Sequence, residues 1–167
     1  TESISLVQAL SSAPEASPQL ILDIGSDQTI AVIASGGTVR ESINIAVAGS
    51  QFSQALMQSQ KISLAEAEKL KAEVGLTAEP SAVVLQRTLQ SLLVEVRMLM
   101  NYWQKKSGER VAKLVVTGGS SSMPGLLPYL GSNLGLEAQQ AVPDTQYKVQ
   151  GQDQISPKFL PVLGLAL

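Results

Sequence analysis

The chain has 167 residues, a formal net charge of −2, and neither cysteine nor histidine. The missing residue types exclude disulfides, thiol nucleophiles, histidine general bases and the usual zinc sites. Basic residues form no cluster larger than Lys105-Lys106, so no nucleic-acid partner is expected. With 44% hydrophobic residues, the length suits one domain with an aliphatic core.

The sequence also bounds where the protein works. It carries no apolar stretch of about 18 residues that would span a membrane. The lack of cysteine is compatible with a reducing cytoplasm. Because the first residue is Thr1 and not Met, we expect a processed product or a piece of a longer protein.

The first third of the chain predicts a short helix, a linker and three strands. Residues 3–10 have the pattern of an amphipathic helix, and the Ser/Ala/Pro-rich residues 11–18 have that of a linker. Apolar runs then predict strands over 19–25, 28–35 and 38–46. Gly36-Gly37 between the last two strands is a two-residue hairpin signal.

Two helices are expected next. Ser50 is a candidate N-cap for a helix over 51–60. Ser63 and Glu66 have the spacing of a capping box, in which the serine caps the helix and the glutamate reaches back to the serine N–H. This pattern predicts a second helix that ends near Glu73.

The longest predicted helix starts at Pro80. Its apolar residues recur at steps of four and three, which places them on one continuous face. These residues are Leu85, Leu89, Leu92, Val96, Leu99 and Trp103. Packing in the core is the favoured interpretation of this face, and a partner-binding groove is the alternative.

The last third predicts alternating strands and helices. A short buried strand over 113–117 leads into Gly118-Gly119, and Pro124 lies just inside a helix over 123–133. A strand over 137–142, a polar loop over 143–154 and an apolar helix over 156–167 complete the chain. The order β-β-β-α, a helical insertion, then β-α-β-α predicts a ribonuclease-H-like α/β domain with a mixed sheet.

Asp23 and the residues after it form the first candidate ligand loop. Asp23 closes the first strand, Gly25 and Ser26 lie in the turn, and Thr29 opens the next strand. A carboxylate in this position can hold a hydrated Mg²⁺, and glycine lets backbone N–H groups approach phosphate oxygens. The same residue types also suit an ordinary hairpin turn, so this pattern alone leaves both interpretations open.

Gly118-Gly119 forms the second candidate ligand loop. It follows the carboxyl end of a buried strand and precedes a helix. Ligands bind at this position in open α/β sheets, and a helix N-terminus attracts anions. A simple tight turn is the alternative. Two such loops at one edge of the same predicted sheet favour nucleotide binding.

Five segments, in order and with family-like spacing, resemble motifs of the actin-like ATPases. They are residues 21–29 (second phosphate motif), 48–53 (the place of a G-G-x-x-x-T element), 65–71 (an A-E-x-x-K helix), 115–126 (adenosine motif) and 163–167 (a G-L-A-L ending). The chain therefore resembles the second half of an actin-like ATPase, of the branch that holds the type IV pilus assembly protein PilM and the cell-division protein FtsA. The short helical insertion and the segment Met98–Trp103 favour the PilM side.

The resemblance implies that the chain binds ATP or ADP with Mg²⁺. Asp23 would order the water shell of the Mg²⁺. The amides of Gly25 and Ser26, with the Thr29 hydroxyl, would face the β- and γ-phosphates.

For the nucleoside, the resemblance implies that Gly118, Gly119 and Ser120 line the adenosine. Glu66 and Lys69, one helical turn apart, would reach the ribose or adenine. A local role for Glu66 as the cap of its own helix is the alternative.

The resemblance also implies a domain organisation. Residues 1–18 would form a bridging helix and linker, 19–60 with 109–167 the ribonuclease-H-like domain, and 61–108 a helical insertion subdomain. An actin-like ATPase grips nucleotide between two such domains, so this chain would lack the first. Alone it would be inactive, and at most a weak ATPase when completed. It could expose an apolar face, including residues 159–167, where the first domain packs.

The partners that the resemblance implies are the missing N-terminal actin-like domain and membrane-anchored proteins of a pilus or secretion machine, with self-association as a further possibility. The protein would be cytoplasmic, held at the inner membrane through its partners. Nucleotide would act as a conformational switch.

Three alternatives stay open. The chain could be a structural adaptor of the same fold that binds no nucleotide, or the second domain of an FtsA-like division protein. A ribonuclease-H-type nuclease would need three or four converging carboxylates, and Asp23 is the one acidic residue at a predicted strand end.

Ala48 and Ser53 depart from the family's glycine and threonine, and an alanine that needed positive φ would be strained.

Overall fold

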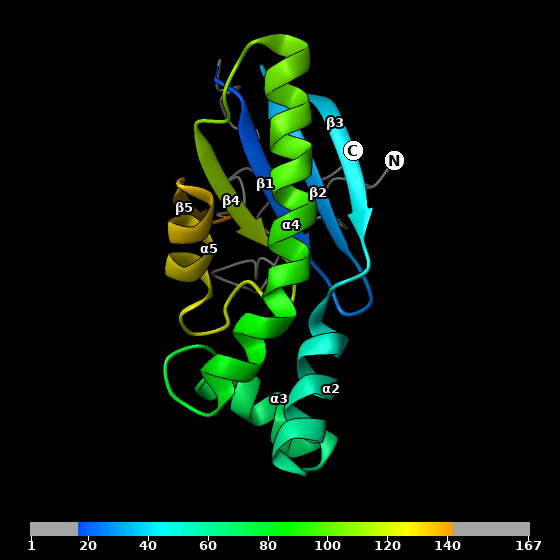
Figure 1. Ribbon diagram of the computed structural model, residues 1–167, viewed down its shortest axis with the longest axis vertical. Helices are drawn as coiled ribbons and strands as arrows, with labels where there is room; N and C mark the ends of the chain where they lie inside the picture. Colours follow the sequence, from blue (N-terminus) through cyan, green and yellow to red (C-terminus); the bar gives the residue numbers. More distant parts are fainter. Residues whose placement is uncertain (1–16, 142–167) are drawn as a thin grey trace, which may run out of the picture.

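The computed structural model describes residues 17–141 (Figure 1). The helix predicted over 3–10, the loop predicted over 143–154 and the helix predicted over 156–167 lie outside the described residues. Within them, the elements in chain order are β1 (Gln19–Ile24), β2 (Thr29–Ser35), β3 (Thr38–Ile45), α2 (Gly49–Gln60), α3 (Leu64–Glu73), α4 (Ser81–Ser107), β4 (Lys113–Thr117), α5 (Leu126–Leu134) and β5 (Glu137–Gln140).

The strands form one mixed sheet in the order β3-β2-β1-β4-β5. Short turns make β1, β2 and β3 an antiparallel meander, because a tight hairpin reverses the chain. The β4 strand returns parallel to β1, and β5 lies parallel to β4, as connections through helices require. The predicted α/β fold with a mixed sheet is confirmed.

The long helix α4 crosses one face of the sheet (Figure 1). All six residues of its predicted apolar face are buried, and they join one core cluster with Leu20 and Leu22 of β1. Core packing is therefore the correct interpretation of this face. Ile21 and Val32 belong to a second cluster of buried residues, because successive side chains of a strand point to opposite faces.

The helix α3 begins as its sequence predicts. The Ser63 hydroxyl accepts a hydrogen bond from the Glu66 N–H at 3.3 Å, and the Ser63 N–H donates to the Glu66 carboxylate at 2.8 Å. These reciprocal bonds satisfy backbone donors that the first turn of a helix leaves free. The Ser63 hydroxyl also donates to the exposed Glu66 carboxylate at 2.7 Å, and this bond together with the one from the Ser63 N–H lowers the pKa of the Glu66 carboxyl. The capping box is confirmed.

The starts of two helices differ from the prediction. The α2 helix begins at Gly49 with Ala48 as its N-cap, and Gln51 accepts a hydrogen bond from the Ala48 N–H at 3.0 Å. Ser50 is thus inside the helix and does not cap it. The α5 helix begins at Leu126, three residues later than predicted, because Gly125 has φ +79° and interrupts the helical backbone.

The predicted division of the chain into a sheet domain and a helical insertion over 61–108 stays a prediction. The α4 helix has contacts on both sides of that division. It packs against α2, and it also packs against β2, β3 and α5. Figure 1 shows α2, α3 and the start of α4 below the sheet, and the rest of α4 across it.

We predict that Leu89→Ala lowers the free energy of unfolding by about 2–5 kcal/mol, because it opens a cavity beneath α4. Leu89 is fully buried in the main core. Val83→Ala on the same helix is the matched control, since Val83 is half exposed, and it should cost less than about 0.5 kcal/mol. Chemical denaturation measures both. Equal effects would contradict the assigned core face.

Candidate functional site

A pocket lies where the carboxyl ends of β1 and β4 meet the helical part of the chain. Its volume is about 530 Å³, within the range of roughly 300–1,000 Å³ for small-molecule sites. Four segments line it: the β1–β2 turn, the start of α2, one face of α3 and the loop after β4. The lining residues are Gly25, Ser26, Gly49, Ser50, Ser53, Gln54, Leu64, Glu68, Lys71, Ala72, Gly119, Ser120, Ser122 and Met123.

Backbone hydrogen bonds pin three of these segments together. The Gly49 N–H donates to the Gly25 carbonyl at 2.9 Å, and the Ser50 N–H donates to the Ser26 carbonyl at 2.8 Å. On the other side, the Ser120 N–H donates to the Ile24 carbonyl at 3.2 Å. The β1–β2 turn therefore holds both the start of α2 and the loop after β4.

Two glycines permit this close approach. A Cβ on Gly49 would lie 3.0 Å from Ser120 Oγ and 3.1 Å from the Gly25 carbonyl oxygen. Gly118 has φ +88°, and a Cβ there would lie 2.5 Å from Asp23 Oδ1 and 2.6 Å from the Ile24 carbonyl oxygen. Any other residue at position 118 would combine a strained backbone with a steric clash.

Lys71 brings a positive charge to the pocket from α3. Its ammonium donates to Ser53 Oγ at 2.8 Å, to Glu68 Oε1 at 2.8 Å and to the Gly49 carbonyl at 3.2 Å. Only 13% of its side chain is exposed. Ser53 in turn donates to Glu68 and to the Gly49 carbonyl. The network ties α3 to the first turn of α2 across one wall of the pocket.

The charge state of Glu68 follows from these contacts. Desolvation raises the pKa of the Glu68 carboxyl, but hydrogen bonds from Lys71 and Ser53 and the positive charge of Lys71 outweigh it, so the pKa lies below its ordinary value. A lowered carboxyl pKa means that the contact is complete at neutral pH. It is lost as the pH falls through that lowered pKa.

The structure brings four of the predicted site residues into the pocket: Gly25, Ser26, Gly119 and Ser120. Gly118 and Asp23 lie side by side directly behind this lining. Thr29 lies elsewhere, because it is fully buried and its hydroxyl donates to the Val47 carbonyl at 2.7 Å. This arrangement does not fit the expected contact between the Thr29 hydroxyl and phosphate. It fits a structural role, in which Thr29 holds β2 to the segment before α2.

Glu66 and Lys69 do not line the pocket. Glu66 is engaged with Ser63 at the start of α3, and both residues are exposed. Residues 65–71 contain the A-E-x-x-K pattern twice, two residues apart, since Ala67 and Glu68 begin a second copy that ends at Lys71. The structure places the acidic and basic residues of the second copy in the pocket.

Sequence reasoning missed Glu68 and Lys71, although a signal for them was present. Leu64, Glu68 and Lys71 recur at steps of four and three, so they share one helical face, and all three line the pocket. The capping box already assigns Glu66 to the helix start. That assignment leaves the second copy of the pattern as the one free to face a ligand.

The two departures from the family's G-G-x-x-x-T element cause no strain. Ala48 has φ −154° and ψ −171°, an extended conformation that any residue adopts. Ser53 keeps the hydroxyl of a threonine and uses it to contact Lys71 and the Gly49 carbonyl. Both substitutions are compatible with the local fold.

Two general features of residues 17–141 bear on the type of site. Within this range, no group of three or more His, Asp or Glu side chains is placed to hold a metal ion. The same part of the chain contains no helix with the length and apolar character needed to cross a membrane.

Comparison with known protein families gives one match over nearly the whole chain. The profile of the family described as "Type IV pilus assembly protein PilM" matches residues 2–167. The chain belongs to the PilM family. A search of functionally curated protein sequences gave no match.

Solved structures agree with the membership in the PilM family. A "PilM-PilN type IV pilus biogenesis complex" matches with a TM-score of 0.79 and 25% identity over 99% of this chain and 49% of that chain. The ethanolamine utilization protein EutJ from Carboxydothermus hydrogenoformans matches with a TM-score of 0.72 and 20% identity over 99% and 53%. MreB5 of Spiroplasma citri bound to AMPPNP matches with a TM-score of 0.69 and 18% identity over 99% and 56%.

These matches establish an actin-like fold for this PilM-family chain. They also show that the chain spans about half the length of the solved structures that it matches. The PilM-family profile agrees with the resemblance to PilM found in the insertion and in the motifs, and favours that branch over FtsA.

We predict that Gly118→Ala destabilises the protein by at least about 2 kcal/mol, because the added Cβ meets Asp23 and Ile24 in a strained backbone. Gly119→Ala is the matched control, since nothing lies within 4 Å of a Cβ at that position. It should change stability by less than about 0.5 kcal/mol. Thermal unfolding of the two variants tests this difference, and equal stability would contradict the loop geometry described here.

Proposed function

We propose that this chain is the nucleotide-binding second half of a PilM-family protein and that its pocket takes ATP or ADP with Mg²⁺. The observation that carries the proposal is the convergence of three glycine- and serine-rich segments and the mostly buried Lys71 side chain on one pocket. Backbone N–H groups, hydroxyls and cations are the groups that bind phosphate and ribose oxygens. Relatives of the same fold have been solved with AMPPNP, which supports this choice of ligand.

We assign a different part of the nucleotide to each group of residues in the pocket. In the β1–β2 turn, the Gly25 N–H donates to the Gln28 carbonyl at 3.1 Å, so we assign the contact with phosphate oxygens to the Ser26 amide. Gly119 and Ser120 offer a flat backbone surface and a hydroxyl to the nucleoside. We assign Lys71, together with its partner Glu68, the role that the resemblance gave to Lys69 and Glu66.

Magnesium would be held mainly by the phosphates and by water. The described residues offer no cluster of carboxylates for direct coordination, and Mg²⁺ commonly keeps several of its waters in nucleotide sites. Asp23, next to Gly118 at the end of β1, is the carboxylate that would orient this water shell. The bound ion would offset the negative charge of the phosphates.

Hydrolysis would need a second domain. The chain spans about half of the solved PilM structure, and in actin-like proteins the nucleotide is gripped between two domains. The residue that orients the attacking water would come from the other half. We therefore propose that nucleotide acts as a conformational ligand for the assembled protein, with weak ATPase activity at most.

The cellular role that we propose is in type IV pilus assembly, at the cytoplasmic side of the inner membrane. The solved relative is a complex of PilM with PilN, which supports a pilus assembly protein as the partner. We propose that this partner is membrane-anchored and binds mainly to the first domain. A structural adaptor that binds no nucleotide is the alternative of a different class.

Titration of Mg-ATP into the protein extended by its first domain tests the proposal. We expect binding by the extended protein and much weaker binding by this chain alone. Lys71→Ala should weaken binding about tenfold or more, because it removes the one cation among the lining residues and its contacts that hold α3 to α2; tenfold corresponds to about 1.4 kcal/mol. Lys69→Ala is the matched control on the same helix and should bind like the wild type. Calorimetry measures all four.

Thermal unfolding shows that each variant is folded. If the Lys71→Ala and Lys69→Ala variants bind Mg-ATP equally well, the role assigned to Lys71 of α3 is wrong. The proposal that the pocket binds nucleotide would not be contradicted by that result. If the extended protein binds neither Mg-ATP nor Mg-ADP, the proposal fails and the adaptor interpretation replaces it.

A further inference from the structure

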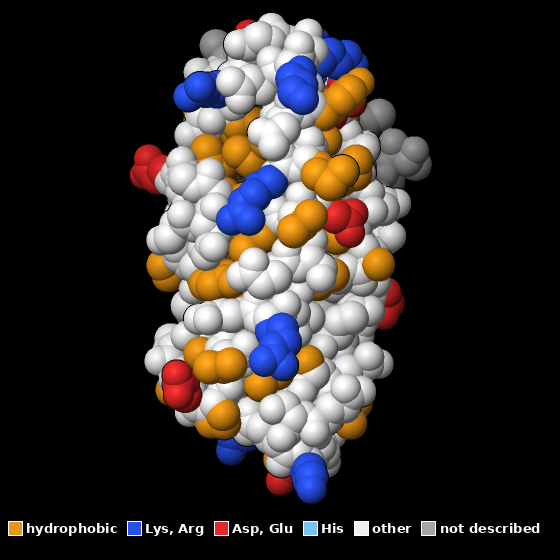
Figure 2. Space-filling model, viewed as in Figure 1, with side chains coloured by type: hydrophobic (Ala, Val, Ile, Leu, Met, Phe, Trp, Pro, Cys, Tyr) orange, Lys and Arg blue, Asp and Glu red, His pale blue; other side chains and the backbone are white. Residues whose placement is uncertain are grey.

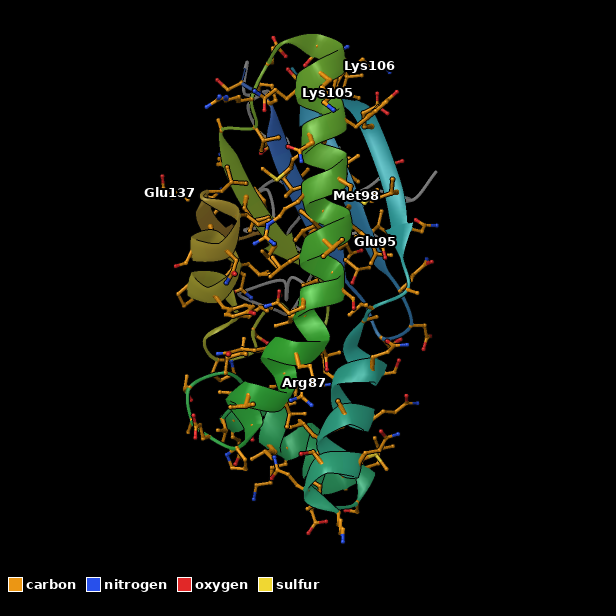
Figure 3. The ribbon with its side chains drawn as sticks, in the orientation of Figure 1. Arg87, Glu95, Met98, Lys105, Lys106 and Glu137 are labelled. Carbon is orange, nitrogen blue, oxygen red and sulfur yellow. The ribbon has the colours of Figure 1, made fainter. Side chains whose placement is uncertain are left out.

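The outward side of α4 carries a stripe of large exposed apolar side chains. Val94, Met98 and Tyr102 are 52%, 66% and 53% exposed, and steps of four residues place them on one side of the helix. This stripe is separate from the buried face of α4, and none of its residues lines the pocket. Figure 3 shows Met98 on the side of α4 that faces away from the sheet. Exposed apolar side chains gathered in this way indicate an interaction surface.

The surface is shaped and supported on its β3 side. A groove of about 340 Å³ runs between α4 and β3, lined by Glu41, Ile43, Glu95, Met98, Leu99 and Tyr102. Lys106 forms an ion pair with Glu41 and lies 5.5 Å from the centre of the Tyr102 ring. These contacts link the C-terminal end of α4 to β3 and hold Tyr102 at the rim of the groove.

The charges around the stripe have opposite sign at its two ends. Glu95 lies one helical turn before Met98, and Lys105 lies one turn after Tyr102. No salt bridge joins either residue to another of the described residues. Figure 3 places both labels along α4 on either side of Met98. Figure 2 shows apolar side chains on this face, with basic side chains near the top and both a basic and an acidic side chain beside the apolar ones farther down.

This arrangement is complementary to itself. Glu95 and Lys105 lie at equal distances along the helix from Met100, and so do Met98 and Tyr102. If a second α4 is laid antiparallel across the first with Met100 at the centre, Met98 of each copy meets Tyr102 of the other. Glu95 of each copy then meets Lys105 of the other. A two-fold interface makes every such contact twice.

We propose that α4 forms a two-fold interface between two copies of this chain, with the Met98–Tyr102 pairs at its centre and the Glu95–Lys105 pairs at its rim. The occupant of the stripe is thus a second copy of the protein. The interface is independent of the nucleotide pocket, and it would join two protomers through their sheet-covering helices. The groove beside β3 receives the Met98 side chain of the partner.

The expected dimer is weak. The helix from Val94 to Lys105 rises only about 17 Å at 1.5 Å per residue, so the contact is small beside a standard interface of roughly 800 Å² per partner. The apolar pairs would supply most of the affinity, and the rim charges would fix the antiparallel orientation. The dimer should therefore form at micromolar concentrations and above.

Sedimentation equilibrium of charge-reversed variants tests the interface. Glu95→Lys alone or Lys105→Glu alone should weaken dimerisation about tenfold or more, because each places two like-charged pairs in contact. The double variant Glu95→Lys/Lys105→Glu should recover dimerisation, since the pairs re-form with their signs exchanged. Glu137→Lys is the matched control, because Glu137 is exposed and lies away from α4 (Figure 3), and it should dimerise like the wild type.

Cysteine cross-linking gives a second readout, since the chain has no cysteine of its own. A mixture of the single variants Glu95→Cys and Lys105→Cys should form a mixed disulfide, whereas a mixture of Glu95→Cys and Glu137→Cys should not. Recovery in the double charge reversal together with the mixed disulfide would establish the interface. The proposed interface would be overturned if the protein stayed monomeric at concentrations about 100-fold above the micromolar range. It would also be overturned if the single charge reversals left dimerisation unchanged.

Discussion

The close approach of three loops at the end of β1 is the constraint on which the rest of the site depends. The β1–β2 turn accepts hydrogen bonds from Gly49 and Ser50 on one side, and Ile24 accepts one from Ser120 on the other. Gly49 and Gly118 permit this spacing because a Cβ on either would collide with a neighbouring loop. This close spacing positions the start of α2, the loop after β4 and the floor of the pocket.

The helical part of the chain is attached to the sheet on both sides of the pocket. On one side, the Gly49 and Ser50 N–H groups of α2 donate to carbonyls of the β1–β2 turn, and Lys71 joins α3 to the same turn of α2. On the other, the Leu76 N–H donates to the Pro124 carbonyl at 2.8 Å. A ligand in the pocket would therefore contact groups fixed to both the sheet and the helices. This geometry suits a site in which binding biases the relative position of the two parts.

The sequence predicted most of the fold because the relevant patterns are local or periodic. The alternation and length of the apolar runs placed β1 to β4 within one residue, and the 3.6-residue period identified the buried face of α4. The site was less predictable. Lys71 and Glu68 differ from Lys69 and Glu66 by only two positions in a repeated pattern. The capping box at Glu66 is the local signal that favours the second copy, and the packing of α3 against α2 places that copy in the pocket. The Thr29 hydroxyl donates a hydrogen bond to the Val47 carbonyl, a long-range contact that no local sequence pattern indicates. The start of α5 moved to Leu126 because Gly125 adopts positive φ.

Amide hydrogen exchange of the two-domain protein, with and without saturating Mg-ATP, tests most directly whether these three loops form the nucleotide site. The amides of residues 24–28, 48–52 and 118–123 should exchange more slowly when nucleotide is bound, because they become hydrogen-bonded or screened from water. The amides of α4 from Val94 to Lys106 should not change. Protection confined to other segments, or unchanged exchange in all three loops while nucleotide is bound, would contradict the account.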